Sequence, residues 1–320
     1  MMATPLVSVG LPVHNGERHI EASLDSLLTQ TFEDFEIIIS DNASTDRTPE
    51  ICKAYAAQDD RIRYYRNTNN VGQTANLSRP IRLARGKYYR MHHDDDLLEP
   101  ECLAACVDVL EAEPAVILCH TQTKIIDDQG EVLYAKEPVD YLLRSPRPHE
   151  RLDKYLRQRF PVSPELGLMN AIFGLIRRRV LDKTPIDGPY PHADVIFCGG
   201  LTLYGAFHVV PQSLFVRRDH PGRSSRARKG MRELALWRDP GNAGRPIMPR
   251  LYGLRDLLRI IQRAPISRAE KMRCGRVVWT RYVRHFYLSM IREMGEETWG
   301  LLRRKAGEQV GGTELGERPA

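Results

Sequence analysis

The chain has 320 residues, of which 42% are hydrophobic and 28% charged, so it can bury a substantial core and is not expected to be disordered. Its formal charge of +6 is uneven, because residues 217–305 carry 23 Lys and Arg against 8 Asp and Glu, whereas residues 1–216 are net negative. No stretch approaches the roughly 18 to 20 apolar residues that cross a bilayer, and the start lacks secretory features, so we expect a cytoplasmic protein with reduced, mostly buried cysteines.

Short apolar runs alternate with helical periodicity through the first 120 residues. Strands are predicted at 6–11, 35–40, 61–66, 86–91 and 115–121, and helices with one apolar face lie between them. This alternation predicts an α/β fold with a mostly parallel sheet and helices on both faces. Pro80 lies inside the helical stretch 70–85, so that helix either begins there, with Ser78 as its cap, or is kinked.

The rest of the chain has a weaker pattern. Residues 127–130 are typical of a hairpin turn and 136–150 of a loop, helices are predicted at 151–160 and from His192, and strands at 206–210 and 213–218. Residues 223–246 are interpreted as a basic mobile loop, 247–305 as a basic helical extension and 306–320 as a flexible tail.

An acidic run, Asp94-Asp95-Asp96, follows the fourth predicted strand, at the sheet edge where α/β proteins bind ligands. Three adjacent carboxylates repel one another, and a divalent cation such as Mg²⁺ or Mn²⁺ can balance them and bridge a diphosphate. Taken alone, such a run is more often a solvated turn that caps the next helix. The neighbouring motifs decide between these interpretations.

Those motifs occur in a definite order: Pro12-Val13-His14-Asn15, then Ser40-Asp41-Asn42-Ala43-Ser44, Asn70-x-Gly72 with Asn76, Gly86-x-Tyr88, the acidic run and Pro100. Their order and spacing resemble the family 2 glycosyltransferases of GT-A fold, strongly over residues 5–120 and moderately over 170–222. The resemblance implies a catalytic domain at 1–222, with a donor half at about 1–120 and an acceptor half at about 121–222. It also implies a nucleotide-diphosphate sugar donor, a Mg²⁺ or Mn²⁺ cofactor and inversion at the transferred sugar.

Site residues follow from the same resemblance. His14 is expected against the nucleotide base, Asp41 at the base edge, Asp94 at the ribose and Asp95 at the metal, with Asp96 in a supporting role. The family often has an aspartate where this chain has His93, so this position departs from the pattern. The remaining expected donor contacts are Pro12, Asn15, Asn42, Asn76 and Arg218.

On the acceptor side, Asp194 resembles the family's general base, which removes the proton of the acceptor hydroxyl. An N-cap is the ordinary alternative for an aspartate at a helix start. His220, in Arg217-Arg218-Asp219-His220, is expected to complete the metal shell, and Arg217, Arg218 or Arg223 to pair with phosphate oxygens. A solvated basic loop explains these last residues equally well.

Two other classes of function are kept as alternatives. A sugar nucleotidyltransferase would use a similar sheet, but no Gly-rich loop with a basic residue follows the first strand. A dinucleotide-dependent oxidoreductase is less favoured still, because GxGxxG is absent after that strand. A non-catalytic protein that binds nucleic acid or a membrane surface would use the basic C-terminal third. Basic helical positions such as Arg259, Arg263, Arg276, Arg281 and Arg284 fit an anionic membrane surface better than nucleic acid, although solvated helix faces are the simplest explanation of them. With weak contact to the inner membrane face, the expected partner is a glycan or lipid-linked acceptor.

Overall fold

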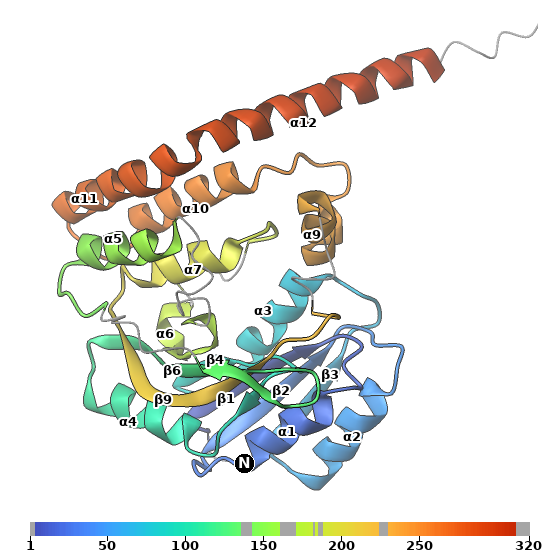
Figure 1. Cartoon of the computed structure of the whole chain (residues 1–320), viewed down its shortest axis with the longest axis vertical. Helices are drawn as coiled ribbons and strands as arrows, with labels where there is room; N and C mark the ends of the chain where they lie inside the picture. The colour runs from blue at the N-terminus through green and yellow to red at the C-terminus, as the bar shows by residue number, and fades with distance from the viewer. Residues whose placement is uncertain are drawn as a thin grey trace, which may run out of the picture.

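The computed structural model describes residues 4–135, 143–160, 171–181, 183–184, 188–223 and 230–311. The predicted loop 136–150 therefore lies partly outside the described residues. Figure 1 shows a sheet covered below by helices and above by several helical layers.

The first half of the chain forms the parallel part of the sheet. Strands β1 (Val7–Val13), β2 (Phe35–Asp41), β3 (Ile62–Arg66) and β4 (Tyr88–Met91) pair in the order β3-β2-β1-β4, all parallel. Helices α1 (Ile20–Leu28), α2 (Thr48–Gln58) and α3 (Gln73–Leu83) connect them. β1 and β2 are rich in β-branched residues and covered on both faces, so their central side chains are buried, whereas the central side chains of β3 are only partly buried.

The second half of the chain makes the sheet mixed. β8 (Leu175–Arg177) lies antiparallel between β4 and β6 (Val116–Ile126), and β6 pairs in parallel with β9 (Ala206–Arg218). β5 (Leu97–Leu98) adds to β9 and β7 (Val132–Ala135) to β6, both antiparallel. The predicted α/β architecture is confirmed, and three of the four parallel strand pairs in the described residues join strands within residues 7–91.

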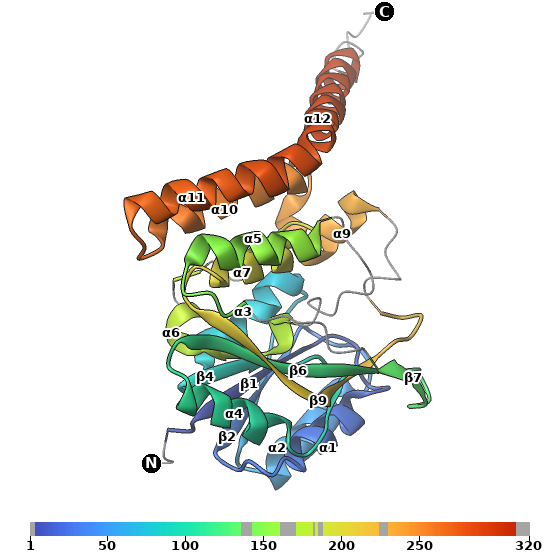
Figure 2. The same cartoon turned by 60° about the vertical axis from the view of Figure 1, so that its left-hand side comes forward.

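A helical region stands over the sheet, as Figure 2 shows. α5 (Pro148–Arg159) and α7 (Ala193–Leu201) form one layer, and α10 (Pro249–Arg263) and α11 (Arg268–Val278) pack on them. The chain then passes through a π-helical turn, η3 (Trp279–Val283), into α12 (Arg284–Gly311), which extends away from the body. Helices α4 (Cys102–Ala112) and α6 (Arg178–Leu181) complete the α/β body. None of the helices in the described ranges is long and apolar enough to cross a membrane.

Several local predictions need correction. The strands expected at 206–210 and 213–218 are one strand, β9, because β6 pairs along its whole length with two register shifts. Helix α3 begins at Gln73 and contains Pro80, which is buried beside Gly10 of β1, where a Cβ would lie only 2.8 Å from the Pro80 Cβ. The absence of a side chain on Gly10 thus gives Pro80 a packing site, and the helix does not begin there.

The C-terminal boundaries also differ from the prediction. Helix α9 (Met231–Arg238) and the 3₁₀ turn η2 (Pro240–Asn242) lie inside 223–246, where a loop is predicted from its Arg, Gly and Pro content. They are held there by Asn242, whose side-chain amide donates to the carbonyls of Pro189 and Ala235. α12 continues to Gly311, past the expected start of the tail at 306. Tertiary contacts and helix continuation both override composition here.

The cysteine prediction is confirmed as far as burial is concerned. All six cysteines are buried and none forms a disulfide.

Candidate functional site

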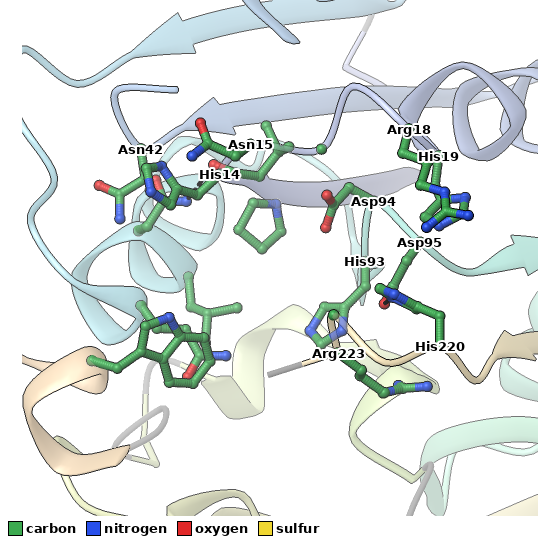
Figure 3. Close-up of a pocket in the computed structure, with 18 of the residues that line it drawn as sticks. His14, Asn15, Arg18, His19, Asn42, His93, Asp94, Asp95, His220 and Arg223 are labelled. Carbon is green, nitrogen blue, oxygen red and sulfur yellow. Dashed lines mark hydrogen bonds and ion pairs between the residues drawn. The ribbon is translucent and has the colours of Figure 1, made fainter. Parts of the chain in front are cut away.

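A pocket opens where β1, β2 and β4 end. Because these neighbouring strands are parallel, the loops that follow them lie side by side at one edge of the sheet. The pocket has a volume of about 470 Å³, and Figure 3 shows side chains from all three loops pointing into it. Eight of the predicted site residues line it: Pro12, His14, Asn15, Asn42, Asn76, Asp94, Asp95 and His220.

One end of the pocket is built from amide side chains. The Asn42 amide donates to Asn70 Oδ1 over 2.8 Å, and its own Oδ1 accepts from the Val71 backbone N–H. Asn70 Nδ2 lies 3.3 Å from Nε2 of the exposed His14. Asn76 is buried and ties the end of β2 to α3 through both the hydroxyl and the carbonyl of Ser40. These bonds hold the imidazole of His14 beside a row of hydrogen-bonding groups suited to a flat heterocycle.

Backbone strain marks the two loops at this end. Asn15 (φ 55°) and Ala43 (φ 59°) adopt the left-handed region, which non-glycine residues avoid. Asn15 joins the two loops, because its backbone N–H donates to the Ser44 hydroxyl and its side-chain oxygen accepts from the Thr45 N–H. Strained positions of this kind concentrate at ligand sites, where the surrounding structure enforces them.

The opposite end of the pocket is acidic. Asp94 packs against the loop after β1, where a Cβ on Gly16 would lie 2.2 Å from Asp94 Oδ2, so only glycine permits this approach. Enclosure by protein and the adjacent charge of Asp95 raise the pKa of Asp94. Asp94 therefore needs a counter-charge or a hydrogen-bond donor from a ligand to ionise fully.

The other two carboxylates have different environments. Asp95 Oδ2 lies 3.0 Å from His220 Nε2; burial opposes its ionisation, but the hydrogen bond to His220 and nearby positive groups outweigh that effect and lower its pKa. Asp96 is fully buried and accepts the backbone N–H of Arg218, and burial followed by the charge of Asp95 raises its pKa to about 7. The three carboxylates of the acidic run therefore have three different environments.

Two histidines precede the run and have different surroundings. His92 is buried beside Ser23, and burial lowers its pKa to about 3. His93 lines the pocket and stacks edge-on against Phe173, with ring centroids 4.7 Å apart, and burial lowers its pKa to about 4. Both rings are neutral at pH 7, so His93 offers an uncharged nitrogen where the family often has a carboxylate.

Two residues that the sequence analysis missed join His220. His19, just before α1, lies with its ring centroid 5.1 Å from that of His220, and its Nε2 is 3.2 Å from Asp128 Oδ1. Asp128 belongs to the turn between β6 and β7, which the sequence identifies only as a hairpin. No local signal distinguishes either residue from an ordinary turn residue. Two groups of side chains are close enough to hold a metal ion among the described residues: His19, Asp128 and His220, and His93, Asp95 and Asp96.

Arg218 and Arg223, both near the acidic run, have different positions relative to the pocket. Arg218 is buried, and its guanidinium donates to the backbone carbonyls of Asp95, Asp127 and Asp128, which connects the loops that carry them. Arg218 is not among the described residues that line the pocket. Arg223 does line the pocket, with Nη2 4.0 Å from Asp96 Oδ2. Trp237 of α9 closes the same pocket from the segment expected to be a loop.

Two further predicted residues lie away from the pocket lining. Asp41 is fully buried, and its carboxylate accepts from the Tyr64 hydroxyl and the Ser44 N–H and pairs with Arg66. Asp194 is half-buried in the first turn of α7, two residues after His192. His192, with a φ of 66°, has the third left-handed non-glycine conformation in the described chain. The roles predicted for Asp41, Arg218 and Asp194 stay predictions.

Comparisons with solved structures identify the fold. S. aureus TarS residues 1–349 in complex with UDP-GlcNAc superposes with a TM-score of 0.60 at 16% identity, over 88% of this chain and 74% of that one. The complex of the same protein with UDP gives 0.59 at 17% identity, over 88% and 72%. These similarities show a GT-A type fold.

Curated relatives share parts of the sequence. An uncharacterized glycosyltransferase of Methanocaldococcus jannaschii is 27% identical over 188 residues, 58% of this chain and 60% of that protein. The chondroitin synthase of Escherichia coli is 32% identical over 130 residues, 40% of this chain and 19% of that protein. The chain thus spans less than two thirds of the length of each of these relatives. The family model for glycosyl transferase family 2 matches residues 8–184, more than half of the chain, and the protein therefore belongs to that family.

Proposed function

We propose that the protein transfers a sugar, with inversion, from a nucleoside diphosphate donor to an acceptor hydroxyl, in the synthesis of a cell-surface polysaccharide or glycan. The observation that carries this proposal is the pocket itself, in which an amide-rich end faces an acidic end across the carboxyl edge of the parallel strands. A nucleotide needs both kinds of wall, one for its base and one for its ribose and charged diphosphate. The family and the fold support the same reaction class.

In this proposal the donor lies along the pocket. His14 and Asn42 contact the base, Asp94 accepts from the ribose hydroxyls, and Arg223 pairs with a phosphate oxygen. Asp41 is already bonded to Tyr64 and Arg66, so we assign it to holding the end of β2 for these contacts and not to the base edge alone.

The acidic end fits a divalent cation. Asp95 Oδ1 and Asp96 Oδ2 are buried without a hydrogen-bond partner in the described chain, and unsatisfied buried carboxylate oxygens are costly. Carboxylate oxygens and imidazole nitrogens are ligands of Mn²⁺ and, for the oxygens, of Mg²⁺. Bound between Asp95 and His220, such a cation would offset the charge of the departing diphosphate.

The acceptor side is assigned to Asp194. Its carboxylate would take the proton of the acceptor hydroxyl, whose oxygen forms the new bond to the anomeric carbon as the bond to the diphosphate oxygen breaks on the opposite face. The left-handed backbone at His192 supports a functional role for this turn, because strain persists where the surrounding structure maintains it.

A membrane-surface contact is part of the proposal. Six of the large apolar side chains that the structure leaves exposed lie on α11, η3 and α12: Met272, Trp279, Tyr287, Leu288, Ile291 and Met294. Trp279, Tyr287, Ile291 and Met294 follow one another at spacings of eight, four and three residues, which places them along one side of a helix. The opposite side is already buried, through Cys274, Val278 and Tyr282.

The charges beside this stripe favour an anionic lipid surface. Arg276 and Arg284 are exposed along it and have no ion-pair partner in the described part of the chain. Tryptophan with arginine on one helix face is typical of helices that lie in the lipid headgroup region. We therefore place the protein at the inner face of a membrane, where a lipid-linked acceptor would be within reach.

Nucleotide binding tests the reaction class. A thermal-shift panel of nucleoside diphosphates, each with and without Mn²⁺, should show one nucleotide that raises the melting temperature, and more strongly with the metal. Uniform shifts for all nucleotides, or none, would count against the proposal. Consumption of a nucleoside triphosphate with release of pyrophosphate would instead identify a nucleotidyltransferase.

A further inference from the structure

The cluster of His19, Asp128 and His220 brings together three parts of the chain that are distant in sequence. His19 precedes α1, Asp128 lies in the β6–β7 turn and His220 follows β9, yet one ligand atom from each lies within 4.8 Å of the others. Asp95, which belongs to the neighbouring group with His93 and Asp96, borders this cluster, because its Oδ2 is 3.0 Å from His220 Nε2. In Figure 3, His19, Asp95 and His220 lie together at one end of the pocket.

These side chains are largely closed off from solvent. The side chains of His19, His220, Asp95 and Asp128 are between 11% and 15% exposed. His19 Nε2, Asp128 Oδ1 and Asp95 Oδ1 are buried atoms without a well-formed hydrogen bond in the described chain. Three of these four side chains therefore keep a buried ligand atom without a hydrogen bond, an arrangement that costs free energy unless something binds there.

We propose that His19, Asp128 and His220, together with Asp95, form a divalent cation site made entirely of protein ligands, which is loaded before any nucleotide arrives. The inference rests on the proposed function, since it concerns the acidic end of the same pocket. It differs in one respect: the cation would be resident in the protein and would not enter with the donor diphosphate.

The ligand set selects the class of metal. Two imidazole nitrogens and two carboxylate oxygens suit Mn²⁺, Co²⁺ or Zn²⁺, whereas Mg²⁺ prefers oxygen ligands and keeps several of its waters. The site should therefore discriminate against Mg²⁺, although Mg²⁺ is acceptable to a site built of carboxylates and phosphates alone.

Arg18 is the competing cation. Its guanidinium bonds to Asp128, and its side chain is 66% exposed, so it can turn into solvent when a metal binds. A metal that uses Asp128 must displace this ion pair. Arg18 therefore provides a variant whose expected effect is opposite to that of removing a ligand.

Calorimetric titration of the chelator-treated full chain with Mn²⁺, Zn²⁺ or Mg²⁺, without nucleotide, tests the site. The wild type should bind one Mn²⁺ or Zn²⁺ and bind Mg²⁺ at least about tenfold more weakly. His19→Ala and Asp128→Asn should each weaken Mn²⁺ binding by about tenfold or more, and Arg18→Gln should strengthen it. Asp108→Asn, at an exposed position on α4, is the matched control and should bind as the wild type does.

Spin-echo spectroscopy of bound Mn²⁺ adds a direct readout, because imidazole ligands produce ¹⁴N modulation that should diminish in His19→Ala. No binding of any of these metals without nucleotide, or binding that neither His19→Ala nor Asp128→Asn weakens, would overturn the inference. Nucleoside diphosphate binding, measured both with chelator and with Mn²⁺ present, keeps the two proposals apart. If a nucleotide binds but no metal binds alone, only the resident site fails; if metal binds but no nucleotide does, the proposed function fails.

Discussion

The pocket at the strand ends and the rod formed by α11, η3 and α12 (residues 268–311) depart from ordinary burial in opposite directions. In the pocket, carboxylates and imidazoles are enclosed, and Asp96 is fully buried. Along the rod, Trp279 is 67% exposed and Leu288 65%. Globular proteins normally bury large apolar groups and solvate charges, so a departure in either direction is informative.

The two departures have different structural causes. Parallel strand pairing forces the loops after β1, β2 and β4 together, whatever side chains they carry, and the polar groups there must find partners. The rod already packs one side on α5 and α10, so its second apolar side has no further element of the described chain to cover it. A bound ligand can supply partners for the polar groups of the pocket, and a membrane surface can cover the apolar side chains of the rod.

The largest effect is expected at Asp194, on the layer that separates the two regions. Asp194→Asn removes a general base but keeps the side-chain shape, so the transfer rate should fall by about 10²–10⁴-fold while nucleotide binding survives. Turnover of the donor identified by the thermal-shift panel, beside Asp108→Asn as control, measures this. Full activity in Asp194→Asn would remove the base assignment.

Paired truncations sharpen the contrast in burial. Leu11→Ala, in the fully buried centre of β1, should cost about 2–5 kcal/mol of unfolding free energy, because it leaves a cavity. Leu288→Ala, on the rod, should change that free energy by less than about 0.5 kcal/mol. Urea titration of both variants provides the measurement. A large loss of unfolding free energy in Leu288→Ala would mean that the Leu288 side chain is packed against another part of the chain and is not exposed.

The exposed apolar side chains of the rod can be tested separately from the pocket by vesicle binding. Partitioning of the double variant Trp279→Ala/Ile291→Ala to anionic vesicles should fall by roughly tenfold to a hundredfold. Each apolar side chain buried in the lipid contributes about 1.5–3 kcal/mol, from which the entropy lost on binding must be subtracted. Sedimentation with vesicles of phosphatidylglycerol and phosphatidylcholine at low salt gives the partition coefficient. The exposed β7 residues Leu133 and Tyr134 offer a matched control, as their replacement by alanine should leave binding unchanged. Failure of the wild type to sediment would contradict the membrane contact.

The smallest effect concerns His120 on β6, away from both regions. Burial lowers its pKa to about 4, so the folded protein keeps this ring neutral while the unfolded chain is protonated below pH 6.5. The contribution to stability is therefore present above pH 6.5 and declines as pH falls towards 4, by at most about 1.4 kcal/mol per pH unit. Urea midpoints of the wild type and His120→Gln should differ most at pH 7.5 and converge near pH 4.5; a constant difference would exclude this linkage.

Much of the fold is visible in the sequence because the relevant signals are local. Alternating strand and helix periods predict β1 to β4 and the helices between them, and the hairpin at 127–130. Short strands such as β5 and β8 are missed, because two or three residues carry no period and exist only through pairing with β9, β4 and β6. Helix α9 is missed for a similar reason.

The residues of the site likewise include some that local sequence signals predict and others that they do not. By itself the sequence determines that Asp94, Asp95 and Asp96 follow a strand end, that His14 and Asn42 follow two others, and that the chain resembles family 2 glycosyltransferases. Only the tertiary structure brings His19, Asp128 and Trp237 to that pocket, places Arg223 at its wall and commits Arg218 to backbone carbonyls. Periodicity reports how each segment meets the core, whereas the convergence of side chains more than a hundred residues apart depends on how strands and turns are packed together.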